Sequence, residues 1–467
     1  MLQNATILRL KMVSFCSMVT WLAHMTRFAH SALLVAALAA QLAAQGVAPH
    51  AFSAVPFDQW LGEPDQKGLH WNIRVADPEL SNHQRLASRL EITVDGAELA
   101  KRRGEGGAFV LLMQVSDEQH RKWRDFESVD LSRLPATVKS SDAVYYRNFF
   151  VLPGDYEVVV AAYDLATSEH FLTRRKFHVA SLHNDPLPDS WKGLPSVEFV
   201  RLPGGPANWF LPFVRSRVKV TAAPTRPAHI DVLLNVSPPD FQAGSARVRN
   251  RNLSALLPSF KVLAQMEHEN TTLNAAVLNL SRQQIVFRQD SVRRLDWPRL
   301  MASIEEDKPG IIDVKSLENR HSSPQFFAGE VMRRLTPEHI VAGESAGSIG
   351  EAGAIPEKPH AVIILTSPVT FEDGADLRPV EAAIPADAKL FYLRYQPAPT
   401  TQLTSARRPG ARRTPDGFFL PPRAGAGPIS DQLAAVLKPA EPKLYDVTTP
   451  EQFRRALAAV LAEIAKM

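Results

Sequence analysis

The sequence predicts an all-β domain followed by an α/β domain, and three observations support this. Short apolar segments with a period of two dominate residues 55–220, whereas buried-strand patterns and helical periodicity alternate from residue 228 onward. The chain has 467 residues, which is too long for one ordinary core. We therefore predict an N-terminal antiparallel, Ig-like β-sandwich, then a doubly wound, mostly parallel sheet with helices on both faces.

The first 46 residues have the pattern of a targeting segment. Arg27 precedes the uncharged apolar run 31–44, which has the length of a signal-peptide core and is short for a membrane span. A second hydrophobic patch precedes Met25, so translation could start at Met1 or Met25. We expect residues 1–46 to be a signal peptide or N-terminal extension and the protein to be exported, to the periplasm, the medium or the cell surface. An N-terminal membrane anchor is the alternative.

Composition and charge argue against several function classes. The formal net charge is only +4, and the basic clusters are scattered among acidic residues without a recognition motif. Nucleic acid is therefore not an expected partner. The single cysteine, Cys16, lies in the removable segment. A processed chain would lack disulfides, a thiolate nucleophile and cysteine-ligated zinc.

Residues 55–181 are predicted to form the β-sandwich. Pro153 and Gly154 predict a tight turn, because proline presets φ and glycine tolerates positive φ. The phrase FVLPGDYEVVV around this turn resembles the final hairpin of immunoglobulin-like modules, in which a tyrosine follows the turn. Strands are expected at residues 108–115, 144–151, 156–163 and 171–179.

Residues 182–227 change character, because frequent prolines exclude a long helix or a central strand. The same stretch contains Trp191, Phe199, Trp209 and Phe210, which is more aromatic surface than a free linker carries. We expect an ordered connector that packs against one or both domains. An exposed aromatic platform for a carbohydrate or a peptide is the alternative.

Residues 228–236 are predicted to form the central strand of a C-terminal domain that spans residues 228–467. Their apolar, β-branched run breaks at Pro238 and Pro239. Helices are expected at 253–263, 296–307 and 324–335 and after Thr449, strands at 273–280, 284–287, 360–367, 389–395 and 444–447, an extended piece at 311–314, and a loop insertion at 397–428. Asp296 and Thr449 are predicted helix caps, each followed closely by a proline.

This order of strands and helices across residues 228–467 resembles the von Willebrand factor A domain. Together with an exported N-terminus and an all-β half, it is similar to the bacterial VWFA-related family of the acidobacterial type. The resemblance implies an ion site at the carboxyl ends of the strands. There a first strand ends in Asp-x-Ser-x-Ser, a later loop supplies Thr and the fourth strand ends in Asp, and together they hold Mg²⁺ or Mn²⁺, which captures a partner's carboxylate.

At the positions that match this ion site, the chain has lost its carboxylates. Asn235 stands where the first Asp belongs, Ser237 matches the first Ser, and Ser367 stands where the second Asp belongs. The remaining rim candidates are Ser322 or Ser323 in place of the Thr, and Thr366 beside Ser367. Since neutral oxygens bind divalent cations weakly, we expect a degenerate site with no metal cofactor, whose rim still binds a ligand.

Displaced acids keep a metal-dependent alternative open. Asp240, Asp373 and Asp376 lie close enough in sequence to the matched positions to form a non-standard cation site. In that case the protein would be a metal-dependent adhesive A domain.

One motif suggests an enzyme. Residues 343–347, GESAG, match the G-x-S-x-G nucleophile elbow with Ser345 as the nucleophile. A helix should follow the serine, but a Gly/Pro-rich stretch follows instead, and His360 is too close downstream to leave room for the acid and the sheet strands. Histidines elsewhere show no ligand spacing. We therefore expect no enzymatic activity, with a serine hydrolase as the alternative.

These observations predict an exported, non-enzymatic binding protein for adhesion or assembly. Its expected partner is a protein or a cell-envelope ligand, and no transmembrane span is expected after signal cleavage. A further alternative places glycan binding in the predicted sandwich, within residues 55–225.

Overall fold

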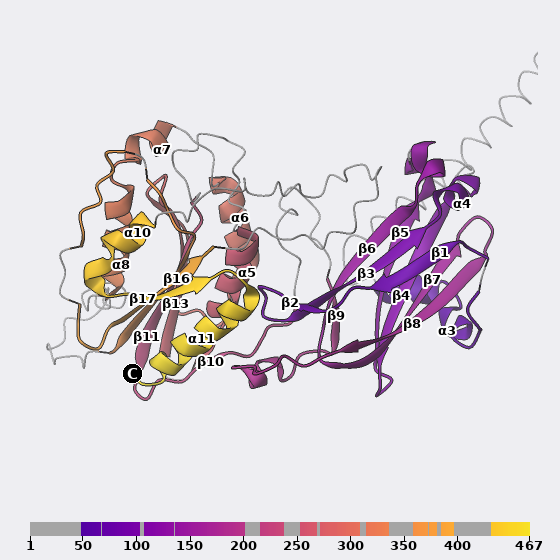
Figure 1. Cartoon of the computed structure of the whole chain (residues 1–467), viewed down its shortest axis with the longest axis horizontal. Helices are drawn as coiled ribbons and strands as arrows, with labels where there is room; N and C mark the ends of the chain where they lie inside the picture. Colours follow the sequence, from indigo (N-terminus) through magenta and orange to yellow (C-terminus); the bar gives the residue numbers. More distant parts are fainter. Residues whose placement is uncertain are drawn as a thin grey trace, which may run out of the picture. The chain divides into compact units, whose positions relative to one another are not determined.

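Figure 1 shows a computed structural model of the chain. The structure describes residues 48–66, 68–102, 107–134, 136–200, 215–237, 253–268, 271–308, 314–335, 358–371, 373–380, 384–396 and 431–467. The predicted signal peptide with Cys16, the GESAG motif with Ser345, and the predicted insertion at 397–428 lie outside the described residues. No helix within the described ranges combines the length and apolar character that a membrane span requires.

The described chain divides into two compact units, of which the first comprises the described parts of residues 1–73, 92–144 and 157–176. Its main sheet has the strand order β5-β4-β7-β8, and β4 and β5 are antiparallel. Phe57, Trp60, Leu112, Val159 and Leu172 form its buried core. The elements are α2 (Ala48–Ser53), α3 (Phe57–Trp60), α4 (Gly96–Lys101), β4 (Ala108–Asp117), β5 (Lys122–Asp130), β7 (Gly154–Asp164) and β8 (His170–Val179).

A further sheet has the strand order β1-β3-β6-β9, with β2 paired to β3. The predicted turn lies between β6 and β7, where Gly154 has a φ of 148° that favours glycine. Tyr156 follows it, and its hydroxyl donates to the carbonyl of Leu152 at 2.9 Å. The strands are β1 (Trp71–Val75), β2 (Glu79–Leu80), β3 (Leu86–Val94), β6 (Ala143–Val151) and β9 (Val197–Phe199).

The second unit comprises residues 74–91, 145–156 and the described parts of 177–467, and it contains a six-stranded sheet. The strand order is β14-β13-β11-β15-β16-β17, in which only the edge strand β14 runs antiparallel to its neighbour. The strands are β11 (Ala228–Asn235), β13 (Thr271–Asn279), β14 (Gln284–Gln289), β15 (His360–Thr366), β16 (Lys389–Tyr395) and β17 (Lys443–Val447), and a separate parallel pair joins β10 (Thr221–Ala222) to β12 (Glu267–His268).

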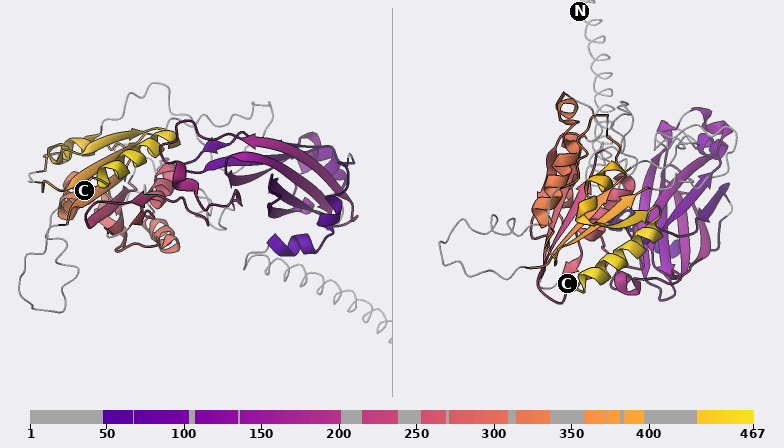
Figure 2. Two further views of the ribbon diagram at one scale, coloured as in Figure 1. Left: turned by 90° about the horizontal axis from the view of Figure 1, so that it is seen from below. Right: turned by 60° about the vertical axis from the view of Figure 1, so that its left-hand side comes forward.

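Helices cover both faces of this sheet, because alternate strand residues enter two different cores (Figures 1 and 2). Ile230, Val232 and Leu234 pack with α5 (Leu253–Leu263), α6 (Trp297–Asp307) and α11 (Pro450–Ile464). Leu233 and Ile364 face the opposite core with α8 (Ser323–Leu335) and α10 (Gln432–Val436). The chain is thus a mixed α/β protein with antiparallel sheets and one mixed sheet, which confirms the prediction at that level.

The predicted extended piece at 311–314 can be checked only at its last residue, because 311–313 lie outside the described residues. There the prediction is wrong, since Val314 begins the short helix α7 (Val314–Asn319). The apolar pair Ile311-Ile312 suggested a strand, whereas most residues after Val314 are polar, and Val314, Leu317 and Glu318 are exposed. The predicted caps are correct, since Asp296 and Thr449 each accept a backbone N–H of the helix that follows.

Candidate functional site

The predicted rim residues of the central strands meet where β11 and β15 end. Asn235 Nδ2 donates to Thr366 Oγ1 at 2.9 Å, and Asn235 Oδ1 accepts from the backbone N–H of Ser237 at 3.0 Å. Thr366 Oγ1 in turn donates to the carbonyl of Ser367 at 2.8 Å. Because β11 and β15 are parallel neighbours, their carboxyl ends reach the same edge of the sheet. The structure therefore brings Asn235, Ser237, Thr366 and Ser367 together.

Ser237 connects this pair of strands to the end of β13. Its hydroxyl donates to Asn279 Oδ1 at 3.3 Å and accepts from the backbone N–H of Leu280 at 2.6 Å. Asn279 Nδ2 then donates to Asp307 Oδ2 at 2.7 Å. The sequence analysis missed both Asn279 and Asp307. We call the hydrogen-bonded set Asn235, Ser237, Asn279, Asp307 and Thr366 the edge network.

Asp307 brings a negative charge to the edge network, and its own partners hold it. It is the last residue of α6 and only 5% exposed. Arg282 Nη1 lies 3.2 Å from Asp307 Oδ1, and Gln284 donates to the same oxygen. A carboxylate at a helix C-terminus is unfavourable by itself, because the helix dipole is negative there. That misplaced acid was a signal in the sequence that could have pointed to Asp307.

The two serine candidates for the missing threonine have different environments. Ser323 is fully buried, and its hydroxyl is directed to the carbonyls of Leu280 at 2.8 Å and Asn319 at 3.0 Å. It therefore joins the backbone beside Asn279. Ser322 is exposed and accepts from Gln283 Nε2 at 2.6 Å. Of the two, Ser323 is the one that lies against the edge network.

The chemistry of the edge network favours a closed structure over a cation site. Its side chains are nearly inaccessible, with Asn235 and Ser237 at 1% exposure and Thr366 at 0%. Their amide and hydroxyl groups are engaged with one another, and Asp307 is paired with Arg282. A divalent cation prefers charged oxygens and would have to break these hydrogen bonds. Among the described residues, no group of three or more His, Cys, Asp or Glu side chains is placed to hold a metal.

A second buried carboxylate lies beyond β15 and was also missed from the sequence. Asp431 caps α10 and accepts from Tyr392 Oη at 3.1 Å, and Arg394 Nη1 lies 3.6 Å away. Burial raises the pKa of Asp431, although its hydrogen bonds and Arg394 oppose the rise. Tyr392 is fully buried, so Asp431 satisfies a hydroxyl that the core would otherwise leave unpaired.

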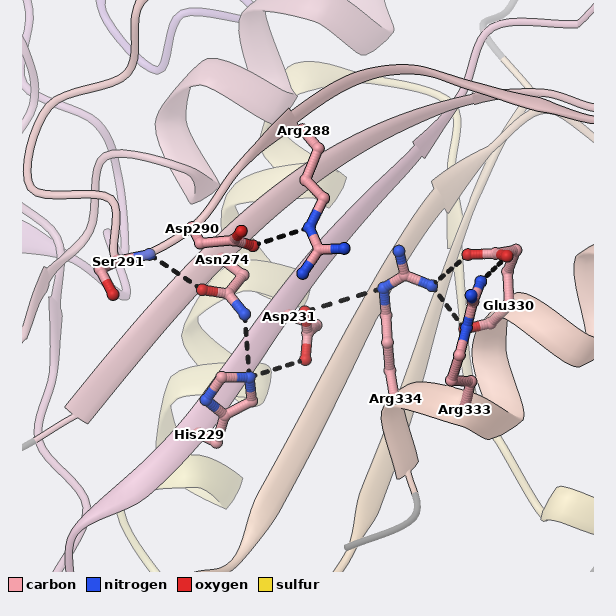
Figure 3. A network of polar contacts seen from close by, with 9 residues as sticks. All are labelled: His229, Asp231, Asn274, Arg288, Asp290, Ser291, Glu330, Arg333 and Arg334. Atoms are coloured by element: carbon pink, nitrogen blue, oxygen red, sulfur yellow. Dashed lines mark hydrogen bonds and ion pairs between the residues drawn. The ribbon is translucent and has the colours of Figure 1, made fainter. Parts of the chain in front are cut away.

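A polar network near the amino end of the same sheet lies on the face that α8 covers (Figure 3). His229 Nε2 lies 3.1 Å from Asp231 Oδ2, and Asn274 Nδ2 lies 3.0 Å from the same histidine nitrogen. Arg334 approaches Asp231 at 3.7 Å and donates to Glu330 Oε2 at 2.7 Å. These contacts pair each buried charge with an opposite one, which is how charged groups are accommodated in a core.

His360 borders this second network at the start of β15. Its ring centroid lies 5.3 Å from that of His229. Burial, and then the neighbouring His229, lower the pKa of His360, while Asp231, Asp387 and the backbone of Arg334 oppose the shift. The network resembles a structural ion-pair cluster more than a catalytic site, because its charged groups are paired with one another.

The displaced acids that could rescue a metal site are not joined to the edge network by the contacts described. Asp376 pairs with Arg378 at 2.6 Å, which together with that residue's hydrogen bonds lowers the pKa of Asp376. Asp373 is exposed on the loop after β15. Asp240 and Ser345 lie outside the described residues.

Comparisons with known proteins assign no family. No family model matches the chain, and no curated protein matches it. Among solved structures, a structural-genomics target designated SoR45 is 13% identical over 25% of this chain and 92% of its own, with a TM-score of 0.17. A Bordetella pertussis protein bearing the name ApaA is 11% identical over 25% and 98%, with a TM-score of 0.16. A glycosyl hydrolase family 2 member from Bacteroides cellulosilyticus is 8% identical over 35% and 18%, with a TM-score of 0.17. Likenesses at this level carry no argument about function.

Proposed function

We propose that residues 228–467 form a von Willebrand A-like domain with a degenerate ion site. The strand order β14-β13-β11-β15-β16-β17, with an antiparallel β14 at one edge, supports this proposal. So does the placement of helices on both faces of the sheet, as expected for a doubly wound domain. The Tyr156–Leu152 hydrogen bond supports an Ig-like sandwich as the companion domain, because such sandwiches fix a tyrosine to the backbone upstream of its strand.

The function we infer is binding, for adhesion or assembly, by an exported protein that catalyses no reaction. The observation that carries it is the edge network, where buried amide and hydroxyl groups bond to one another at the sheet edge that α/β proteins use for ligands. Without a coordinated cation, the partner would contact the exposed rim around this edge. His321 and Asp373 are exposed there, and His321 Nδ1 lies 3.2 Å from the carbonyl of Gly374.

The test is capture of a partner from the envelope fraction of the source organism, with the full chain and a rim variant, Asp373→Lys. We expect the wild-type protein to retain a partner in EDTA as well as in Mg²⁺. Asp373→Lys should reduce the amount of captured partner at least tenfold. Asp290→Lys is the matched control, because Asp290 is also exposed but follows β14 at the amino end of the sheet. Equal capture by all three proteins would refute binding at the rim.

A cation titration separates this proposal from a metal-dependent A domain. We expect the wild-type chain to have the same melting temperature in millimolar Mg²⁺ or Mn²⁺ as in EDTA. The reason is that the edge network offers mainly neutral oxygens that are hydrogen-bonded to one another. A saturable rise of several degrees, together with capture that EDTA abolishes, would support the metal-dependent alternative instead.

A further inference from the structure

A small pocket in the second unit gathers positive charge from three separate segments. It is lined by the turn before β3, the chain ahead of β10 and one side of α5. The pocket has room for about one water molecule, because the centre of a water-sized particle can occupy about 20 Å³ within it. Arg85, Arg217 and Lys261 contribute its cationic side chains, and His83 lies beside them.

Arg85 and His83 line this pocket and carry buried polar atoms that no described residue satisfies. Arg85 is 2% exposed, and its Nη1 pairs with the carboxylate of Glu198. Its Nε and Nη2, and His83 Nε2, have no hydrogen-bond partner among the described residues. Buried polar groups are normally satisfied, and in the tautomer that protonates Nε2 all three of these atoms could donate to one bound acceptor. Phe150, which stacks 4.6 Å below the Arg85 guanidinium, holds that side chain in place.

The charges around the pocket favour an anion over a water molecule in that place. Lys261 lines the pocket from α5, and its Nζ lies 4.9 Å from the ring centroid of Trp297. Glu198 accepts from Arg85 and from the backbone N–H of Arg215 at 2.7 Å, so its carboxylate is already engaged. A halide would bring negative charge to Arg85, Lys261 and the exposed Arg217, which a neutral water would not do.

The cations beside His83 and the burial of Lys261 both disfavour further positive charge in this pocket. Burial, and then Lys261 and Arg85, lower the pKa of His83 to about 3. Burial lowers the pKa of Lys261 to about 8, while Glu198 opposes the shift. An added negative charge would relieve this repulsion.

We propose that the pocket between Arg85, His83 and Lys261 binds a small monovalent anion of the halide class. The pocket has room for about one water-sized particle, which matches a single halide ion, and a halide accepts several N–H donors at once. The ion would receive hydrogen bonds from Arg85 Nε or Nη2 and from His83 Nε2, with Lys261 supplying charge. The site is independent of the proposed rim and would link the turn before β3 to α5.

Halide binding would be linked to protonation of Lys261. A bound anion raises the pKa of its ammonium, so binding takes up a proton above pH 8 and the affinity falls as the pH rises. We expect a loss approaching tenfold per pH unit between pH 8.5 and 10. The titratable and charged groups around Lys261 include His83, Arg85 and Arg217, which line the same pocket, and Glu198, which opposes the lowering of the Lys261 pKa.

The experiment measures the melting temperature of the full chain against sodium chloride and sodium bromide, with sodium gluconate at equal ionic strength as the reference. Halides should give a saturable rise at pH 7 that weakens at pH 10. Lys261→Met keeps the contact with Trp297. It should raise the half-saturating halide concentration at least tenfold and remove the pH dependence of halide binding. Lys219→Gln, in an exposed pair with Glu267, should leave the halide response unchanged.

Crystals grown in sodium bromide provide the direct readout. Bromide should give an anomalous peak within hydrogen-bond distance of Arg85 Nε or Nη2. Identical melting curves in halide and gluconate, or a peak assignable only to water, would overturn the proposal, even if Lys261→Met were unstable, because both measurements use the wild-type chain.

Discussion

Asp307 is the acid of the edge network, and removing it tests how much this residue stabilises the network. Asp307→Ala takes the acceptor from Asn279, Arg282 and Gln284 at once. We expect the free energy of unfolding to fall by about 2–4 kcal/mol, since buried donors and a cation lose their partner. Urea unfolding monitored by circular dichroism measures the change.

The control for this substitution is Asp290→Ala, which removes a carboxylate from an exposed pair with Arg288. Its cost should stay within about 0.5 kcal/mol, because exposed ion pairs contribute little. If Asp307→Ala were equally mild, the edge network would owe its stability to the backbone alone.

His360 should make the protein less stable as the solution becomes acidic. Its folded pKa lies below the unfolded value near 6.5, so the unfolded state binds more protons, and the free energy of unfolding falls as the pH drops below about 6.5. The slope from one such group is at most about 1.4 kcal/mol per pH unit. His360→Leu should flatten the curve between pH 6.5 and 5.

The comparison for His360 is His178→Gln, which alters a histidine whose side chain is 67% exposed. This control should follow the wild-type curve. Denaturant unfolding at several pH values gives the three curves, and a His360→Leu curve that parallels wild type would show that another group causes the acid sensitivity.

The sequence located some site residues and missed others for a physical reason. Asn235 and Ser367 follow apolar runs that predict strands, so their position at one sheet edge could be inferred. Asn279 lies at the end of a predicted strand as well, but its link to Ser237 spans 42 residues and depends on which strands are neighbours. The local sequence pattern does not encode the order of strands in the sheet. The contact between Asp307 and Asn279 could therefore be predicted only once that strand order was known.

Helix α11 packs on one face of the sheet of the second unit. Its first turn shows how the local sequence stabilises a helix. Thr449 Oγ1 accepts from the N–H of Gln452 at 3.3 Å, and Gln452 Oε1 accepts in return from the N–H of Thr448 at 2.6 Å. Thr449→Ala should cost about 1 kcal/mol in urea unfolding. Thr449→Ser keeps the acceptor and should recover most of the loss; an equal loss in both variants would assign the effect to the threonine methyl group.

Elements differed in how well the sequence predicted them. The strands β11, β13, β15 and β16 are nearly all buried, so they appear as continuous apolar runs. Strand β3 alternates perfectly between buried and partly exposed residues, but its outward positions include Arg89 and Glu91, and no strand was assigned to it. β5 has few buried residues, and its charged surface hid it for the same reason.

At the scale of the second unit, two buried arginines hold distant segments together in a way that the sequence alone does not reveal. Arg85 pairs with Glu198, 113 residues away, and Arg454 pairs with Asp185, 269 residues away. Arginine is rarely buried without a partner, and neither partner lies near it in the chain. In the described part of the predicted connector, Trp191 packs on the core and donates to the carbonyl of Gln84 at 2.7 Å, whereas 201–214 lie outside the described residues.

Arg454 of α11 is therefore the residue whose loss should loosen the second unit most. It is 2% exposed, donates to both oxygens of Asp185 at 2.6 and 2.8 Å and to Ser190 Oγ at 2.7 Å, and stacks on Trp191. Arg454→Met leaves the partly buried Asp185 without its cation and should lower the free energy of unfolding by about 2–4 kcal/mol.

The double variant Arg454→Met with Asp185→Leu separates charge from packing. Removing both partners should recover part of the loss, because no buried charge then lacks an opposite one.

The pH dependence offers a second check: burial opposes ionisation of Asp185, but the hydrogen bonds from Arg454 hold its pKa below the usual value. The pair therefore stabilises the protein above the unfolded pKa near 3.9, and that contribution is lost as the pH falls through the folded value. A double variant no more stable than Arg454→Met would mean that the stack on Trp191, and not the ion pair, holds α11 to the connector.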